Sequence, residues 1–280
     1  MNKMYDLSVV MGSKNRKKLL KATINSIRTN GFNGNIEIIV VDGGSNDGTC
    51  DWLAKQTDVL TIVQPNYTIV NDKGIKCKAH SWGEFMNIGF KYSHSDYIVM
   101  VSDDLILAPN CLQKGYDEIK RRIESGEKIG GGAFYFREYP RHDYYRVITI
   151  PKGYVNINHG FYYKPALEDV NWLDEVNYYF YCGDGDITMR LNENGWKTVP
   201  LNECYAAHLV HLPVKKKKIP KWNQIDMDTF KKLYPYKRIG DIIKKTNVDI
   251  EIDISAFWKY ALKNVLCGYL LRIYDNYVRK

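Results

Sequence analysis

Residues 36–41 are almost continuously apolar, and this run places the strongest constraint on the fold. A strand with one face in water alternates apolar and polar residues, whereas a strand that is apolar on both faces is typical of a parallel sheet covered by helices on both sides. Comparable runs occupy residues 7–11, 59–63 and 96–101, with helical patterns between them. The chain is therefore predicted to be an α/β protein with a doubly wound, mostly parallel, Rossmann-like sheet, in which ligands bind beyond the carboxyl ends of the strands.

Helical patterns account for much of the remaining chain. The first helix is expected to have Ser13 as its N-terminal cap and to end at Gly31. Further helices are predicted over about residues 51–56, 79–92, 109–123, 166–172 and 184–194. Two more strands are predicted over residues 129–136 and 196–212, with strands and loops in the tyrosine-rich residues 139–164.

The composition narrows the possible partners and the location. A chain of 280 residues with 45% hydrophobic residues is large enough to bury a sizeable core. Its formal net charge of +8 favours anionic ligands such as nucleotides, phospholipid surfaces or nucleic acids. The six cysteines show neither close pairing nor a Cys-x-x-Cys motif, which argues against a zinc site or a disulfide framework and favours a reducing, cytoplasmic location. A signal peptide and a transmembrane helix are not expected.

The chain changes character after residue 212. Residues 215–218 are four consecutive lysines between two prolines, and a weakly patterned stretch leads to a last helix near residues 255–277. Apolar residues of this helix recur at i, i+3, i+4 and i+7, so it is predicted to be amphipathic. Its apolar stripe is interpreted as a surface that packs on the rest of the protein or on a second copy. Peripheral attachment to an anionic membrane is the alternative.

Two acidic clusters, far apart in the sequence, are each expected at the end of an element. Asp103 and Asp104 follow an apolar strand, where carboxylates can hold a metal ion. Asp184 lies where a helix begins, and a carboxylate in such a position can act as a base. Alternatively, these residues are caps of turns or helices. For Asp186 and Arg190, four residues apart, an ordinary ion pair within the helix is the preferred interpretation.

Four motifs in a fixed order resemble a known family. They are Leu-Ser-Val-Val at residues 7–10 with Lys-Asn-Arg at 14–16, Ile-Ile-Val-Val-Asp-Gly-Gly-Ser-Asn-Asp-Gly-Thr at 38–49, Ser-Asp-Asp at 102–104, and Gly-Asp-Gly-Asp at 183–186 with Arg190 and Gly195. Over roughly residues 5–212 the chain resembles the inverting, family-two-like glycosyltransferases of the GT-A fold, which transfer single sugars from nucleotide-sugar donors. The resemblance implies a catalytic domain over residues 1–212, with donor binding at about 1–110 and the acceptor side at about 111–212, and a basic helical extension over 213–280.

The resemblance also implies catalytic roles. Asp184 takes the place of the catalytic base, which removes the proton from the acceptor hydroxyl as that oxygen attacks the anomeric carbon. Asp103, assisted by Asp104, takes the place of the ligand of a divalent cation, Mn²⁺ or Mg²⁺, which stabilises the departing diphosphate. Val101 stands where the family usually has the first acid of its Asp-x-Asp motif, and Mg²⁺ commonly binds through only one or two carboxylates.

Other residues are implied in binding the donor. Asp42 corresponds to the carboxylate that accepts a hydrogen bond from the base, with a UDP-sugar the favoured donor, although a turn-starting aspartate is equally natural by composition. Ser13, Asn15 and Arg16 are the other residues expected to contact the nucleotide.

The histidines and the overall function leave alternatives open. His208 and His211 are candidate ligands of the metal or the diphosphate, and a structural role is at least as typical of each. A sugar nucleotidyltransferase is one alternative function, and a non-catalytic protein with a basic binding tail is another. The acceptor is expected to be a glycan, a lipid-linked glycan or a protein. Contact with a membrane or a second copy through residues 213–280 is open, and nucleic acid is disfavoured as a partner.

Overall fold

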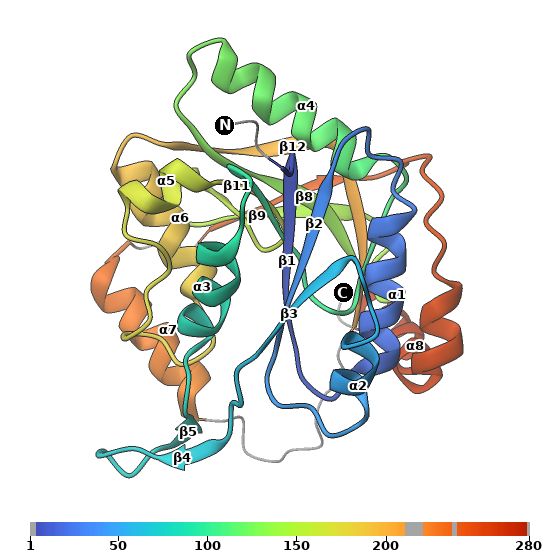
Figure 1. Cartoon of the computed structure of the whole chain (residues 1–280), viewed down its shortest axis with the longest axis horizontal. Helices are drawn as coiled ribbons and strands as arrows, with labels where there is room; N and C mark the ends of the chain where they lie inside the picture. The colour runs from blue at the N-terminus through green and yellow to red at the C-terminus, as the bar shows by residue number, and fades with distance from the viewer. Residues whose placement is uncertain (1–3, 211–220, 237–239, 279–280) are drawn as a thin grey trace.

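The computed structural model describes residues 4–210, 221–236 and 240–278, and a large curled sheet forms its centre (Figure 1). One half of this sheet is parallel and consists, in spatial order, of β3 (Val59–Val63), β2 (Ile36–Asp42), β1 (Leu7–Ser13) and β6 (Tyr97–Met100). The predicted fold class, a mostly parallel α/β sheet, is confirmed, and each strand expected in this half is present.

The other half of the sheet contains antiparallel pairs. It consists of β11 (Gly160–Tyr163) between β6 and β8 (Ile129–Tyr139), then β9 (Tyr145–Thr149) and β10 (Val155–Asn156), with a 3-10 turn at Pro151–Gly153. β12 (Lys197–Leu209) runs parallel to β8 and antiparallel to β7 (Leu105–Leu107). A separate hairpin of β4 (Thr68–Val70) and β5 (Lys76–Lys78), which the sequence did not predict, follows β3.

Helices lie on both sides of the sheet. They are α1 (Lys17–Arg28), α2 (Thr49–Leu53), α3 (Trp82–Tyr92), α4 (Cys111–Glu124), α5 (Lys164–Asp169), α6 (Gly183–Glu193), α7 (Lys221–Leu233) and α8 (Ser255–Tyr277). In Figure 1, α3, α6 and α7 lie to the left of the parallel strands, and α1 and α8 lie to the right. The carboxyl ends of β1 and β2 point to the bottom of this view, and that edge of the sheet is where ligands are expected.

Packing on both faces explains why the parallel strands are apolar throughout. Val9 of β1 joins a core that includes Leu20 of α1, while the next residue, Val10, joins a second core that includes Phe90 of α3. Successive side chains of a strand point to opposite faces, so both cores need apolar residues. Gly89 allows α3 to approach β1 closely, because a Cβ there would lie 2.4 Å from Val10 Cγ1.

The expected helix cap at Ser13 is wrong. Ser13 is the last residue of β1, and its hydroxyl donates to Asp103 Oδ2 over 2.8 Å. α1 begins four residues later, at Lys17, and Arg16 at its cap position makes no capping hydrogen bond through its side chain. Asp47 supplies the missing acceptor, since its Oδ2 accepts from the Lys17 N–H over 3.1 Å. The hydroxyl of Ser13 therefore binds a carboxylate at the carboxyl edge of the sheet and does not cap a helix.

The C-terminal part packs onto the sheet. β13 (Ile242–Lys245) pairs antiparallel with β9, and α8 contacts both α1 and β12. The lysines at residues 215–218 lie outside the described residues.

The predicted amphipathic pattern of the last helix is wrong, although its bounds are confirmed. Phe257 and Val265 of α8 are fully buried, whereas Leu262 and Leu270, which lie three positions before and five after Val265 and follow the same apolar spacing, are 52% and 66% exposed. Apolar side chains thus occupy two faces, and Ala261 interrupts the helix with φ −140° and ψ 35°. Among the described residues, no helix is long and apolar enough to cross a membrane.

Val265 of α8 and Val278, the residue directly after this helix, test how α8 is attached to the domain. Val265→Ala should lower the free energy of unfolding by roughly 2 kcal/mol, because it removes two buried methyl groups and leaves a cavity. Val278→Ala, at a position that is 66% exposed, is the matched control and should change stability by less than about 0.5 kcal/mol. Urea denaturation of both variants measures the difference, and equal stabilities would show that α8 is not held through Val265.

Candidate active site

The carboxyl ends of three neighbouring strands bring together residues that the sequence singled out. Ser13 and Asp42 end β1 and β2 and lie opposite each other in the register of these strands. Asp103 and Asp104 follow the end of β6, the strand on the other side of β1. The hydrogen bond from Ser13 to Asp103 joins two of these strand ends directly. One edge of the sheet therefore carries three buried carboxylates.

Arg16 bridges the two adjacent carboxylates. Its Nη1 donates to Asp103 Oδ1 over 2.7 Å, and its Nη2 donates to Asp104 Oδ2. Burial raises the pKa of the Asp103 carboxyl to about 6, although the positive charge of Arg16 opposes this rise. For Arg16, burial acts in the opposite direction and lowers the pKa of the guanidinium. The negative charges of Asp104 and Asp103 outweigh burial and leave this pKa above its ordinary value. Arg16 therefore stays charged and compensates two carboxylates in a dry environment.

Two histidines extend this cluster. His208 on β12 places its Nε2 at 3.2 Å from Asp104 Oδ1. Burial lowers the pKa of His208, but the negative charge of Asp104 outweighs burial and raises the pKa above its ordinary value. The ring of His159 lies 5.3 Å from that of His208. Burial, followed by repulsion from His208, lowers the pKa of His159 to about 3, so this ring is neutral.

His159 was missed by the sequence analysis. It lies just before β11, and only the pairing of β11 with β6 and β8 brings it to His208. Gly160 makes this pairing possible, because a Cβ there would lie 2.1 Å from the carbonyl oxygen of Gly132 on β8. No local spacing in the sequence indicates this contact. His211, the other predicted ligand, lies outside the described residues.

Asp184 lies in the first turn of α6 and is held by amides. Asn156 Nδ2 donates to its Oδ2 over 3.0 Å, Asn158 Nδ2 donates to the same oxygen, and the Gly185 N–H donates to Oδ1 over 2.9 Å. Burial raises the pKa of Asp184, and these N–H groups partly counteract the rise. Asn158 precedes β11, which starts opposite Met100 at the end of β6. The pairing of these strands places Asp184 at the edge that carries Asp103.

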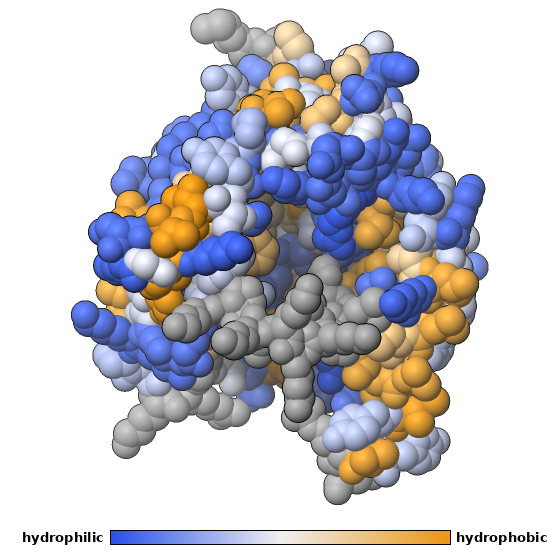
Figure 2. All heavy atoms as spheres, turned by 90° about the horizontal axis from the view of Figure 1, so that it is seen from below, coloured by the Kyte–Doolittle hydropathy of each residue, from blue (hydrophilic) through white to orange (hydrophobic). Residues whose placement is uncertain are grey.

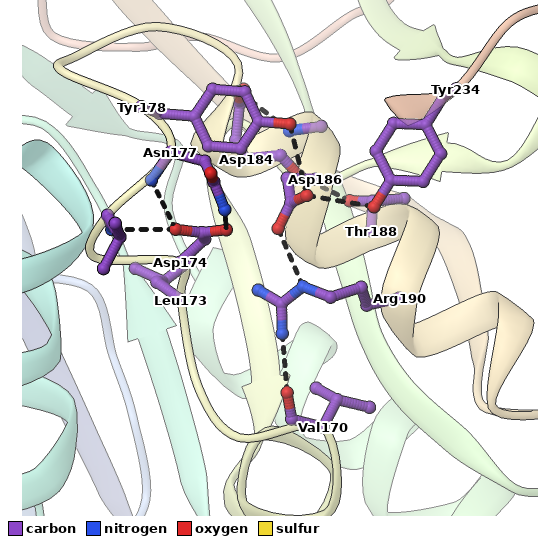
Figure 3. Close-up of polar contacts among 12 residues, drawn as sticks. Val170, Leu173, Asp174, Asn177, Tyr178, Asp184, Asp186, Thr188, Arg190 and Tyr234 are labelled. Carbon is purple, nitrogen blue, oxygen red and sulfur yellow. Dashed lines mark hydrogen bonds and ion pairs between the residues drawn. The ribbon is translucent and has the colours of Figure 1, made fainter. Parts of the chain in front are cut away.

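Asp186, two residues further along α6, has a structural role. Arg190 Nε donates to its Oδ2 over 2.7 Å, and the hydroxyl of Tyr234 donates to its Oδ1 over 2.9 Å. The Tyr178 hydroxyl approaches the same oxygen from the other side, and Arg190 Nη1 also donates to the Val170 carbonyl over 2.6 Å (Figure 3). The predicted ion pair between Asp186 and Arg190 within the helix is therefore confirmed.

A second carboxylate, Asp226 of α7, holds the loop that enters α6. Its Oδ1 accepts from the Tyr179 N–H over 2.8 Å, and its Oδ2 accepts from the N–H groups of Phe180 and Tyr181 over 2.9 and 2.8 Å. Asp226 is fully buried, yet these three backbone donors satisfy it. The side chains of Phe180 and Tyr181 remain 50% and 41% exposed, and the Phe180 ring lies 6.4 Å from that of Trp222. Residues of the tail thus shape the surface beside Asp184.

Asp42 organises the loop that follows β2. Its Oδ1 accepts from the Ser45 N–H and its Oδ2 from the Ser45 hydroxyl, both over 2.7 Å. The backbone N–H of Asn15 donates to the same hydroxyl over 2.8 Å, and Asn15 Oδ1 accepts from the Asn46 N–H over 2.8 Å. The loops after β1 and β2 are therefore tied together. Contact between Asp42 and a nucleotide base stays a prediction.

The carboxylate oxygens and the imidazole nitrogen at this edge of the sheet are types of ligand that suit a divalent cation. A carboxylate oxygen of Asp104 and an imidazole nitrogen of His208 face each other over 3.2 Å, and Asp103 is adjacent. In the described parts of the chain, no three or more histidine, cysteine, aspartate or glutamate side chains are grouped as a metal site. Mg²⁺ and similar ions are commonly held by one or two protein groups, with phosphates and waters completing the shell. The residues present fit such a partial site.

Comparison with protein families matches residues 8–174, more than half of the chain, to glycosyl transferase family 2. The chain belongs to this family. It is a glycosyltransferase, as its motifs predicted, and the nucleotidyltransferase and non-catalytic alternatives are set aside. Among curated proteins no match was found.

Solved structures agree on the fold of this family-2 glycosyltransferase. Residues 1–349 of S. aureus TarS match with a TM-score of 0.54 and 15% identity, covering 98% of this chain and 73% of that one. The same part of TarS has also been solved with UDP-GlcNAc. The mannosyltransferase PcManGT from Pyrobaculum calidifontis, in complex with GDP-Man and Mn²⁺, matches with a TM-score of 0.57 and 12% identity, covering 96% and 72%. The GT-A fold is thus confirmed.

The role of α7 can be tested at Asp226. Asp226→Asn should speed amide hydrogen exchange at residues 179–181, because the new amide group presents a donor to backbone N–H groups that need acceptors. Asp228→Asn, two residues further along α7 at an exposed position, is the matched control and should leave that exchange unchanged. Hydrogen exchange followed by mass spectrometry reads both, and equal protection in the two variants would contradict the assigned role.

Proposed function

We propose that this glycosyltransferase transfers a single sugar from a nucleotide-sugar donor to a hydroxyl group of a glycan or other acceptor, with inversion and with Asp184 as the general base. One observation supports this assignment above the rest. Asp103, Asp104 and Asp186 each have a cationic partner, whereas the hydrogen bonds to Asp184 come from amide groups. A cationic partner lowers the basicity of a carboxylate, whereas burial with neutral donors preserves it and fixes its direction.

We assign donor binding and proton removal to different halves of the sheet. Asp42, Asp103 and Arg16 lie on the parallel half, where the donor is proposed to bind, with its diphosphate toward Arg16. Asp184 comes from the antiparallel half, through α6 and its asparagine partners. Inversion needs the base on the face of the sugar opposite to the leaving group. Carboxylates contributed by opposite halves of one edge suit that arrangement.

Proton movement on the acceptor side involves Asp184 alone. As the acceptor oxygen bonds to the anomeric carbon, its proton passes to the Asp184 carboxylate, while the bond from that carbon to the diphosphate oxygen breaks. Asn156 and Asn158 keep the accepting oxygen oriented. On the donor side, Asp104, His208 and Asp103 are proposed to hold a divalent cation. When bound, it stabilises the charge that develops on the diphosphate.

Substitutions of two aspartates of α6 should separate an effect on turnover from an effect on stability. Asp184→Asn should reduce kcat by about two orders of magnitude or more, because it keeps the size of the side chain and removes its ability to accept a proton, while affinity for the donor nucleotide persists. Asp186→Asn should instead destabilise the fold by about 2 kcal/mol or more, because it leaves Arg190 without its ion pair. Turnover numbers and thermal melts of both variants measure this contrast, and near-normal turnover in Asp184→Asn would refute the assignment.

The pH profile provides a second test of the same residue. The base must be ionised to act, so kcat/KM should fall by about tenfold per pH unit below the raised pKa of Asp184. In Asp184→Asn the residual activity should no longer follow that ionisation. An acid limb with the same midpoint in the variant would assign the titration to another group.

The donor side is tested with nucleoside diphosphates. Asp103→Ala, Asp104→Ala and His208→Ala should each abolish the strengthening of UDP binding by Mn²⁺, because each removes a proposed ligand. Asp42→Ala should weaken UDP binding equally with and without Mn²⁺, since its proposed contact is with the base. Calorimetric titrations with each variant provide the measurement. Full transfer activity in the presence of EDTA would contradict the metal role.

A further inference from the structure

The outward face of α8 carries an unusual run of exposed apolar side chains. Its members follow one another at intervals of three or four residues and define the α8 stripe: Trp258, Leu262, Leu266, Leu270, Ile273 and Tyr277, which are between 39% and 81% exposed. The opposite face of the helix holds Phe257, Val265 and Gly268, which are buried. The helix is therefore anchored by one apolar face while a second one meets the solvent. Contiguous exposed apolar surface of this kind indicates an interaction site.

Positive charge accompanies the stripe. Lys259 and Lys263 are exposed within or beside it, and Lys18 of the neighbouring α1 lies 5.9 Å from the ring of Tyr260. The carboxylate of α8, Asp275, turns away and accepts a hydrogen bond from Arg141 over 2.7 Å. Apolar side chains flanked by lysines match the two parts of an anionic bilayer surface, its acyl boundary and its headgroups.

The composition of the stripe favours lipid over a second copy of the chain. A tryptophan and a tyrosine lie at its two ends, and both residue types prefer the interface between lipid and water. The exposed acids Glu251 and Asp253 precede the first turn of α8, and the exposed carboxylate of Asp143 is paired with Arg272 of α8 over 2.7 Å.

We propose that the α8 stripe and its lysines dock this enzyme on an anionic lipid surface. Figure 2 views the molecule from the side of the carboxyl ends of β1 and β2, and hydrophobic side chains gather over α8 in this view. The apolar surface over α8 is exposed on the side of the molecule that carries the active-site edge, so docking through the stripe keeps this edge close to the lipid. If the proposed sugar transfer holds, an acceptor carried on a lipid would meet that edge. The docking itself does not depend on the reaction.

The test uses the full chain and vesicles of phosphatidylcholine, with or without phosphatidylserine. The protein should sediment with the mixed vesicles at low salt, and salt or the omission of phosphatidylserine should weaken binding. The triple variant Leu262→Gln, Leu266→Gln and Leu270→Gln should lose on the order of tenfold or more in vesicle affinity, because it removes apolar area from the interface.

Two further variants make the result decisive. The triple variant Leu60→Gln, Val63→Gln and Val70→Gln alters exposed apolar positions elsewhere, as the matched control, and should bind vesicles normally. Lys259→Gln with Lys263→Gln should lower affinity for the anionic vesicles on the order of tenfold and flatten the salt dependence, without touching the apolar core. Absence of vesicle binding by the unaltered chain overturns the proposal, as does equal binding by all three variants. Dimerisation that the α8 triple variant abolishes, without vesicle binding, would assign the stripe to a second copy.

Discussion

Two adjacent carboxylates buried at the end of one strand require a positive charge beside them. Asp103 and Asp104 are almost fully shielded from water, where an uncompensated charge costs several kcal/mol. Arg16 lies close enough to both to supply that charge, and His208 of β12 approaches Asp104 over 3.2 Å. These contacts join the loop after β1, the turn after β6 and a strand from the far half of the sheet. The arrangement of the sheet edge that carries Asp103 and Asp104 follows from this single electrostatic requirement.

The other half of the site rests on backbone and amide hydrogen bonds. Asp184 is oriented by Asn156, Asn158 and the start of its own helix. The rigidity of that helix comes from elsewhere: Asp186 is bound by Arg190 within α6 and by Tyr178 and Tyr234 on either side (Figure 3). Asp184, the proposed proton acceptor, thus receives hydrogen bonds from uncharged amide groups, while Asp186, two residues later, pairs with the cation Arg190.

The C-terminal part is integrated with the elements that position Asp184. Asp226 of α7 orders three successive N–H groups of the loop before Asp184, and β13 extends the sheet. α8 uses one face for attachment, and its other face stays apolar and exposed. The C-terminal residues therefore both support the loop before Asp184 and expose an apolar face of α8.

The sequence by itself determined the α/β class, the parallel strands and the acids at their ends, because burial imposes a local periodicity that can be read residue by residue. It also determined the family, through motifs whose order is fixed along the chain. The partners of the site were decided only by tertiary structure. His159, Asn156 and Asn158 reach the site through antiparallel pairing late in the sheet, and Ser13 turned out to serve Asp103 rather than a helix. Such contacts join residues that lie far apart in sequence, and they depend on strand pairing and loop closure, which leave no local pattern.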